Sequence, residues 1–229
     1  GTVAGSQLIA TDHIDTPYIN TQEIKTNLIT PTDLTLTTGA NKTLVLESVV
    51  WDDMRVTGGN IDRPGVSDPV WVAYNVNGGG VSTYLLEFAL NDYGTFVVQL
   101  PHSYKLGSDI LAHVHWTPGP NGVAKNGNSV GWKIQYSWAN VDGTFPTMAT
   151  ADCSDVCDGT NHKHQMSPDV TIAGSGKGIS SMLLCNITRT DTGADDTWAG
   201  TASGSLPLLM EVDFHYQIDT VGSRQDDVK

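Results

Sequence analysis

LLMEVDFHYQI, residues 208–218, is the stretch that decides the fold, because two kinds of side chain alternate along it. One face would be apolar or aromatic and would carry Leu208, Met210, Val212, Phe214, Tyr216 and Ile218. The other face would carry Glu211, Asp213, His215 and Gln217. Successive side chains of a β-strand point to opposite faces, so this period of two predicts a strand with one buried and one polar side.

Other stretches extend this pattern into a whole domain. Residues 130–138 alternate strictly, residues 110–116 place His113 and His115 opposite an apolar face, and residues 180–188 are apolar on both faces, as in a central strand. Further strands are expected at residues 43–50, 70–76, 84–90 and 95–100, the last two as a hairpin around residues 91–94. Loops are expected at residues 140–159 and 191–205, which are rich in Gly, Asp and Thr. About eight or nine short strands with frequent turns indicate an all-β chain, folded as an antiparallel, jelly-roll-like β-sandwich.

The composition excludes several classes of protein. The formal net charge is −13, with 12 Lys and Arg against 25 Asp and Glu, so the chain lacks the cations that neutralise nucleic-acid phosphates. No apolar run reaches the length of a membrane span, and no signal-peptide pattern opens the sequence.

A repeat of period five precedes the predicted sandwich. Its apolar positions are Ile14, Ile19, Ile24, Ile29 and Leu34, and Thr follows the first three of them by two residues. Neither a helix nor a flat strand keeps residues of this spacing on one face, so the chain would have to bend once in every repeat. Residues 12–41 are therefore predicted to form an intertwined β stalk, with three chains as the usual number in such fibres. A flexible Thr-rich tail is the alternative.

The His113-Val-His115 motif is the strongest candidate for chemistry, because alternate histidines on a strand point the same way and are spaced to share a metal ion. With Gly107 it matches the start of the cupin metal signature. The acidic residue expected next is missing, since Gly119 and Pro120 stand there. We therefore expect no catalytic metal site and no cofactor.

Other roles remain open for His113, His115 and His215. Around a threefold axis, copies from three chains would surround an ion or form a pH-sensitive contact. The simpler alternative is hydrogen bonding to acids or carbonyls at a surface or a subunit interface.

Nothing in the sequence predicts an enzyme. It has no Gly-x-Ser-x-Gly motif, and acidic pairs such as Glu211 and Asp213 are expected by chance in a chain this acidic. Trp198 and Trp71 would either stack on a ligand or cap the core. Cys153, Cys157 and Cys185 are expected as free thiols, with a small disulfide between the first two as the alternative.

Several stretches together resemble a family of small structural proteins from the virions of tailed bacteriophages, described as tail-fibre or head-fibre-like. They are TLVLESVVWDD (43–53), LPHSY (100–104) with Gly107-Ser-Asp109, HVHW (113–116), WKIQYSWANVDGT (132–144), His164-Gln165 and FHYQIDTVGSRQ (214–225). HVHW and FHYQIDTVGSRQ are the most specific. The resemblance implies a virion component without enzyme activity and supplies no catalytic residues.

The sequence thus predicts a leader at residues 1–11, the stalk at 12–41 and a β-sandwich head at 42–229. The expected protein is a homotrimeric phage fibre, made in the host cytoplasm, whose leader binds other virion proteins. Its head would attach to a host-surface glycan or protein or to other virion components. A capsid-decorating head fibre is one alternative, and a metal-dependent or glycan-cleaving enzyme domain is another.

Overall fold

A computed structural model describes residues 45–76, 79–80, 82–119, 125–200, 204–223, 225–226 and 228, with the side chains of 45–47 not included. The predicted leader and the predicted stalk, with Ile14, Ile19, Ile24, Ile29 and Leu34, lie outside the described residues.

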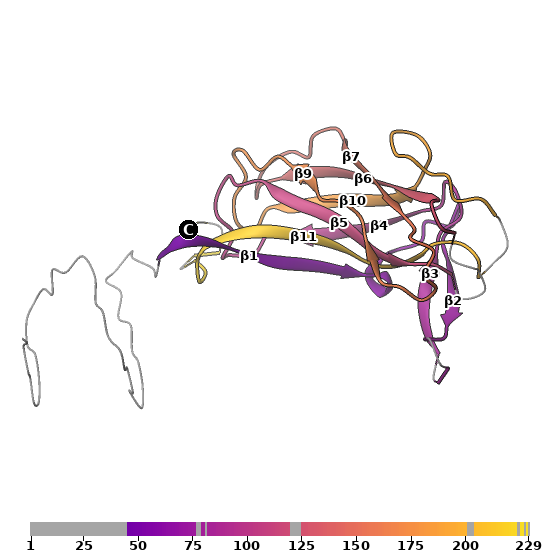
Figure 1. The fold of residues 1–229 in the computed structure, drawn as a ribbon. Helices are drawn as coiled ribbons and strands as arrows, with labels where there is room; N and C mark the ends of the chain where they lie inside the picture. Colours follow the sequence, from indigo (N-terminus) through magenta and orange to yellow (C-terminus); the bar gives the residue numbers. More distant parts are fainter. Residues whose placement is uncertain are drawn as a thin grey trace, which may run out of the picture. The chain divides into compact units, whose positions relative to one another are not determined.

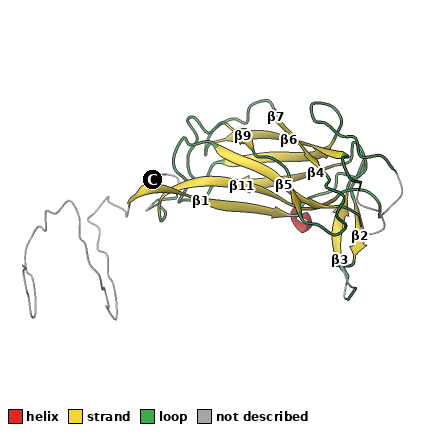
Figure 2. Cartoon of the chain, in the orientation of Figure 1, coloured by secondary structure: helices red, strands yellow, loops and turns green. Residues whose placement is uncertain are grey.

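Two antiparallel sheets form the described part of the chain (Figures 1 and 2). The larger sheet contains β1 (Val45–Thr57), β2 (Val70–Tyr74), β3 (Thr83–Glu87), β5 (Ile110–Thr117), β8 (Gln165–Met166), β9 (Val170–Ile172) and β11 (Leu208–Thr220). The smaller sheet contains β4 (Tyr93–Gln99), β6 (Ser129–Ala139), β7 (Ala149–Val156) and β10 (Met182–Arg189). The predicted antiparallel β-sandwich is confirmed.

Strand β11 is central to the larger sheet. The strand order of the larger sheet is β2-β3-β11-β5-β8, with β1 also paired to β11 and β9 also paired to β5. The smaller sheet has the order β4-β10-β6-β7, so β10, apolar on both faces in sequence, is an inner strand as expected. A single 3-10 turn, Gly58–Asn60, follows β1, and no helix in the described ranges has the length and apolarity of a membrane span.

Aromatic side chains from the two sheets meet in the core. The rings of Phe96 in β4 and Phe214 in β11 lie 6.0 Å apart between centroids. Trp132 in β6 is fully buried and receives the ring of Phe88 edge-on at 5.4 Å. Burying one such side chain stabilises the folded state by about 1.5–3 kcal/mol, so the inward faces of these strands provide the main driving force for folding.

The predicted hairpin between residues 84–90 and 95–100 is wrong, because β3 and β4 belong to different sheets. Asn91 adopts a left-handed conformation (φ 70°), and its N–H donates to the carbonyl of Arg189 at 2.8 Å. The carboxylate of Asp92 accepts a hydrogen bond from the N–H of Ala89 at 2.8 Å. These bonds direct the chain across to the smaller sheet instead of back along β3.

Strand β7 lies inside residues 140–159, which were predicted to be a loop. Its inward side chains include Ala151 and Cys153, which are small, so no strong apolar alternation marks the strand in the sequence. The loop predicted at residues 191–205 is confirmed over its described part, which contains no strand.

A buried ion pair ties this second loop to the sandwich. Arg189 and Asp196 have side chains 1% and 3% exposed, and two nitrogen–oxygen contacts of 2.8 and 2.9 Å join them. The guanidinium also donates to the carbonyls of Phe88 (3.1 Å) and Trp198 (2.8 Å). The N–H of Gly131 in β6 donates to the same carboxylate at 3.0 Å. The pair therefore joins the loop to β6 and β10 through satisfied hydrogen bonds.

Removing the carboxylate of this pair should strongly destabilise the protein. Asp196→Ala leaves the Arg189 charge buried without a partner, and we expect the free energy of unfolding to fall by about 3–5 kcal/mol. Urea denaturation followed by circular dichroism measures the change. The matched control is Lys163→Ala, which removes an ion pair with Asp158 whose side chains are 48% and 42% exposed and should leave the midpoint unchanged. An Asp196→Ala midpoint equal to that of the wild type would contradict the role given to the pair.

Candidate functional site

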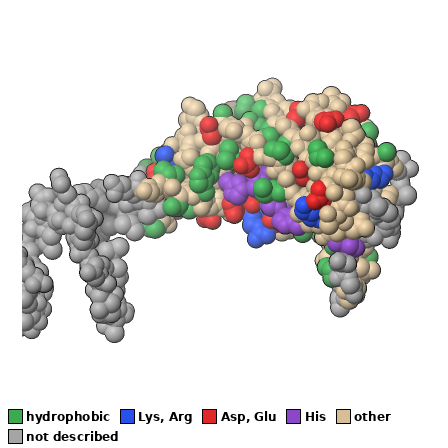
Figure 3. Space-filling view, in the orientation of Figure 1, with side chains coloured by type: hydrophobic (Ala, Val, Ile, Leu, Met, Phe, Trp, Pro, Cys, Tyr) green, Lys and Arg blue, Asp and Glu red, His purple; other side chains and the backbone are tan. Residues whose placement is uncertain are grey.

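Histidines and carboxylates gather on the face of the larger sheet that points away from the core. Figure 3 shows histidine side chains beside acidic ones on one side of the molecule. The members of this histidine cluster are His113, His115, His164, His215, Asp53, Asp169, Glu211 and Asp213.

The cluster arises from the register of three neighbouring strands. Side chains of directly opposed residues lie on the same face of a sheet and contact each other. Register places Asp213 opposite His113, Glu211 opposite His115, and His215 opposite Asp53. The polar alternation of β11 is thus matched on both sides, by β5 and by β1.

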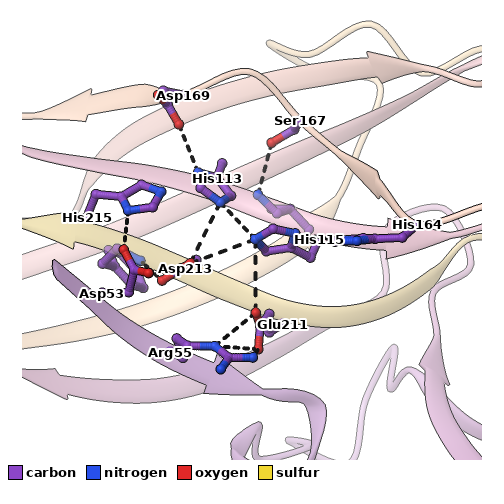
Figure 4. Close-up of polar contacts among 12 residues, drawn as sticks. Asp53, Arg55, His113, His115, His164, Ser167, Asp169, Glu211, Asp213 and His215 are labelled. Carbon is purple, nitrogen blue, oxygen red and sulfur yellow. Dashed lines mark hydrogen bonds and ion pairs between the residues drawn. The ribbon is translucent and has the colours of Figure 1, made fainter. Parts of the chain in front are cut away.

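His113 lies at the centre of the cluster and is 1% exposed (Figure 4). Its Nδ1 lies 2.8 Å from Oδ1 of Asp169, in the connection between β8 and β9, and its Nε2 lies 2.9 Å from Nε2 of His115. Since an ionised carboxylate only accepts hydrogen bonds, Nδ1 of His113 carries the proton. In the neutral imidazole, Nε2 of His113 then presents a lone pair to His115.

His115 connects the centre of the cluster to its rim. Its Nδ1 lies 2.6 Å from Nε2 of His164, and its Nε2 lies 3.8 Å from Oδ2 of Asp213 and 4.0 Å from Oε1 of Glu211. Arg55 holds Glu211 from the other side, with Nε 3.1 Å from each carboxylate oxygen and Nη2 2.8 Å from one of them. Glu211 is therefore fixed by a guanidinium, whereas Asp213 faces the imidazoles.

Asp213 is 4% exposed and is held in its ionised form. Burial by itself would raise its pKa, but the neighbouring imidazoles of His115, His215 and His113, together with the N–H of Phe214, outweigh burial and lower the pKa. Burial, followed by the neighbouring His115, lowers the pKa of His164. The cluster therefore combines a buried negative charge with an imidazole that favours its neutral form.

Three overlapping sets of groups in the cluster have ligand atoms within 4.8 Å of one another, close enough to hold a metal ion. They are His113, Asp169 and His215; His113, His115 and Asp213; and Asp53, Asp213 and His215. Imidazole nitrogens combined with a carboxylate oxygen suit first-row transition metals better than Mg²⁺ or Ca²⁺, which take oxygen ligands.

A small cavity adjoins the cluster at His164. Its volume is about 220 Å³, and its walls are formed by Tyr74, Val76, Thr117, His162, His164 and Met210. Met210 faces this cavity and is only half-buried, because the pairing of β11 with β5 shifts between Leu209 and Glu211. The sequence had placed Met210 on the inner face.

The three histidines singled out in the sequence lie together within one chain. His113 and His215 have ring centroids 4.6 Å apart, as do His113 and His115. Sequence reasoning missed Asp169 and named His164 only in the resemblance to phage proteins, without a role in this cluster; both come from connections without any strand pattern. An arrangement of histidines around a threefold axis stays a prediction.

The two candidate stacking tryptophans differ in their surroundings. Trp198 is 4% exposed, packs edge-on against Trp116 with centroids 5.7 Å apart, and donates from Nε1 to the carbonyl of Ser205 at 3.1 Å. It therefore caps the core and has no free face for a ligand. Trp71 in β2 is 42% exposed, so its role in stacking stays a prediction.

The cysteines are free thiols, and all three are buried. Burial raises the pKa of Cys185 to about 12 and also raises that of Cys153. The alternative of a disulfide between Cys153 and Cys157 is not present in the structure.

Comparisons with known proteins find structural likeness only. No protein-family model matches the chain, and no curated protein matches it. Similar solved structures include isomalto-dextranase of Arthrobacter globiformis T6 complexed with panose, which is 14% identical with a TM-score of 0.36 over 71% of this chain and 23% of that one. They also include infectious bursal disease virus of the Gt strain (13% identical, TM-score 0.34, 86% of this chain and 38% of that one) and of the Gx strain (11%, 0.27, 85% and 56%).

Viral structures are thus among the neighbours, and the chain spans less than two thirds of the length of each protein named. With TM-scores below 0.5, these likenesses carry no argument about function.

Because the three thiols are buried, we expect thiol reagents to modify the native protein slowly. A thiol-specific reagent such as 5,5′-dithiobis(2-nitrobenzoic acid) should react with none of the 3 cysteines within minutes in buffer and with all 3 in denaturant. Burial shields all three thiols, and it disfavours the reactive thiolate of Cys153 and Cys185. Absorbance of the released thiolate gives the count. If the number of thiols that react in denaturant rises by two after the protein is treated with a reductant, the protein contains a disulfide, which would contradict the structure.

Proposed function

We propose that this chain is a virion structural protein without enzyme activity. In this proposal it is the subunit of a homotrimeric fibre, with residues 12–41 as an intertwined stalk. Its β-sandwich head attaches to a host surface or to other virion components. The stretches that resemble tailed-phage fibre proteins, HVHW and FHYQIDTVGSRQ among them, support this proposal.

The observation that carries the proposal is an exposed apolar segment at the start of the head. Val49, Val50 and Trp51 follow one another in β1 and are 38%, 46% and 47% exposed. Successive side chains point to opposite faces of a strand, so both faces of β1 are apolar and uncovered here. Among the described strands β1 pairs only with β11, which leaves its other edge open. Exposed apolar patches and open strand edges are typical of interaction sites.

The position of this segment favours a second copy of the chain as its partner. It begins eight residues after the predicted stalk ends at residue 41. Chains wound together through residues 12–41 would hold their β1 strands near one another. The net charge of −13 makes separate heads repel, so the apolar segment would supply attraction where the stalk already imposes proximity.

The acidic pair considered for glycan cleavage, Glu211 and Asp213, is already engaged, and so is Asp52 in β1. Glu211 is bound by Arg55, and Asp213 is 4% exposed among histidines. Asp52 accepts a hydrogen bond from the hydroxyl of Tyr216 at 2.9 Å. General acid–base work on a sugar needs carboxyl groups that reach the substrate. These contacts support a binding role for the head over a catalytic one.

Light scattering coupled to size-exclusion chromatography tests the proposal. We expect a mass of three times the 24.5 kDa chain, and the mass of one chain after residues 1–40 are deleted. Replacing Val49 and Trp51 with Ser should weaken the trimer, because it removes the apolar contact. The matched control, Val97→Ser, alters a side chain 54% exposed on β4 and should leave the mass unchanged. A monomeric full chain would contradict the proposal.

Immunogold labelling of intact particles separates the two virion roles. Label at the tail supports the tail fibre, and label on the capsid supports the decorating alternative. Release of sugars from host-surface glycans by the purified chain would overturn the non-enzymatic reading.

A further inference from the structure

We propose that His113, His115 and Asp213 bind one divalent transition-metal ion of the Zn²⁺ class within a single chain. This inference goes beyond the proposed virion role and depends neither on the trimer nor on the stalk. Its starting point is that two imidazole nitrogens and one carboxylate oxygen from β5 and β11 face one another (Figure 4).

The separations between these three atoms suit a shared ion. Nε2 of His113 and Nε2 of His115 lie 2.9 Å apart, and each lies 3.8 Å from Oδ2 of Asp213. With zinc–ligand bonds of about 2.0–2.2 Å, ligand atoms at octahedral to tetrahedral angles are separated by about 2.8–3.6 Å. Shifts of a few tenths of an ångström in the side chains would complete the site.

The proton inventory of the cluster supports the same three atoms. Nδ1 of His113 donates to Asp169, so its Nε2 lone pair points at Nε2 of His115. Two lone pairs repel at 2.9 Å, and therefore a proton on His115 must bridge the two nitrogens when no ion is bound. When a divalent cation binds, this proton would move to Nδ1 of His115, which would donate to Nε2 of His164 with a matching change of tautomer there, and both Nε2 lone pairs would bind the cation together with the carboxylate of Asp213.

The surroundings provide the outer shell that metal-binding histidines usually have. Asp169 accepts from the remote nitrogen of His113 at 2.8 Å, which fixes its tautomer and orientation. The remote nitrogen of His115 lies 2.6 Å from Nε2 of His164. Glu211 is occupied by Arg55, so the protein would supply three ligands and leave a further position for water or an external group.

The other two sets in the cluster are less suited. Both use His215, whose Nδ1 is already hydrogen-bonded to Asp53, with side chains 28% and 42% exposed. One of them also includes Asp169, which already accepts the Nδ1–H of His113. The set with His115 is the only one of the three that uses nitrogens directed at each other.

The experiment uses the full chain without a histidine tag, stripped with a chelator and titrated with Zn²⁺ and Co²⁺. We expect one Zn²⁺ per chain bound at this site by calorimetry and elemental analysis, and visible d–d absorption on binding of Co²⁺. His115→Ala and Asp213→Asn should each weaken binding by about 100-fold or more, because each removes a ligand. Asp169→Asn, at a side chain 48% exposed, should weaken it by about 10–100-fold.

Two matched controls locate the site. His215→Ala removes a histidine of the alternative sets, and His102→Ala removes one held by Ser180 and Ser223 away from the cluster. Both should bind Zn²⁺ as the wild type does.

Circular dichroism of each stripped variant separates loss of a ligand from loss of folding, and the isosteric Asp213→Asn keeps the test valid if an alanine variant does not fold. Failure of the wild type to bind either ion stoichiometrically, or unchanged binding by both His115→Ala and Asp213→Asn, would overturn the proposal.

Discussion

The antiparallel register of β5 against β11 is the constraint on which both the core and the histidine cluster depend. With Asp213 opposite His113, the aromatic ring of Phe214 points inward and the imidazoles point away from the core. A slip of one residue would turn the histidines into the core and expose Phe214. The apolar packing of one face thus sets the geometry of the polar groups on the other, without any dedicated interaction between the two faces.

The sequence predicts the sandwich because two of its long strands, β6 and β11, alternate clearly, and a similar alternation in β5 puts His113 and His115 on one face. It does not predict which strands are neighbours, since pairing depends on contacts between residues far apart in the chain. The sequence pattern does not predict β7, because the inward side chains of this strand are small. The crossing between β3 and β4 depends on a hydrogen bond from Asn91 to the distant carbonyl of Arg189 and on one between Asp92 and the nearby N–H of Ala89. The link from Asp169 to His113 comes from a connection without periodicity.

Two groups of buried polar side chains, the ion pair of Arg189 with Asp196 and the histidine cluster, differ in chemistry. Arg189 and Asp196 form a buried ion pair held by several hydrogen bonds, and this pair closes a loop over β6 and β10 as a fixed element of the fold. The cluster around His113 consists of groups that exchange protons and can take other cations. The ion pair of Arg189 with Asp196 stabilises the fold. The histidine cluster can exchange a proton for another cation without any change in the strands that carry it.

The central position of β11 also determines the order in which the head can form during synthesis. β11 is the most C-terminal of the described strands, and the ion pair it makes with β1 joins residues 156 positions apart in sequence. While the ribosome is still making the chain, β1, β3 and β5 lack β11, and the strand edges that pair with it are unprotected. Such long-range pairing folds slowly. The nascent chain must therefore stay soluble until β11 emerges. Its large excess of acidic residues favours this, because like-charged unfinished chains repel one another.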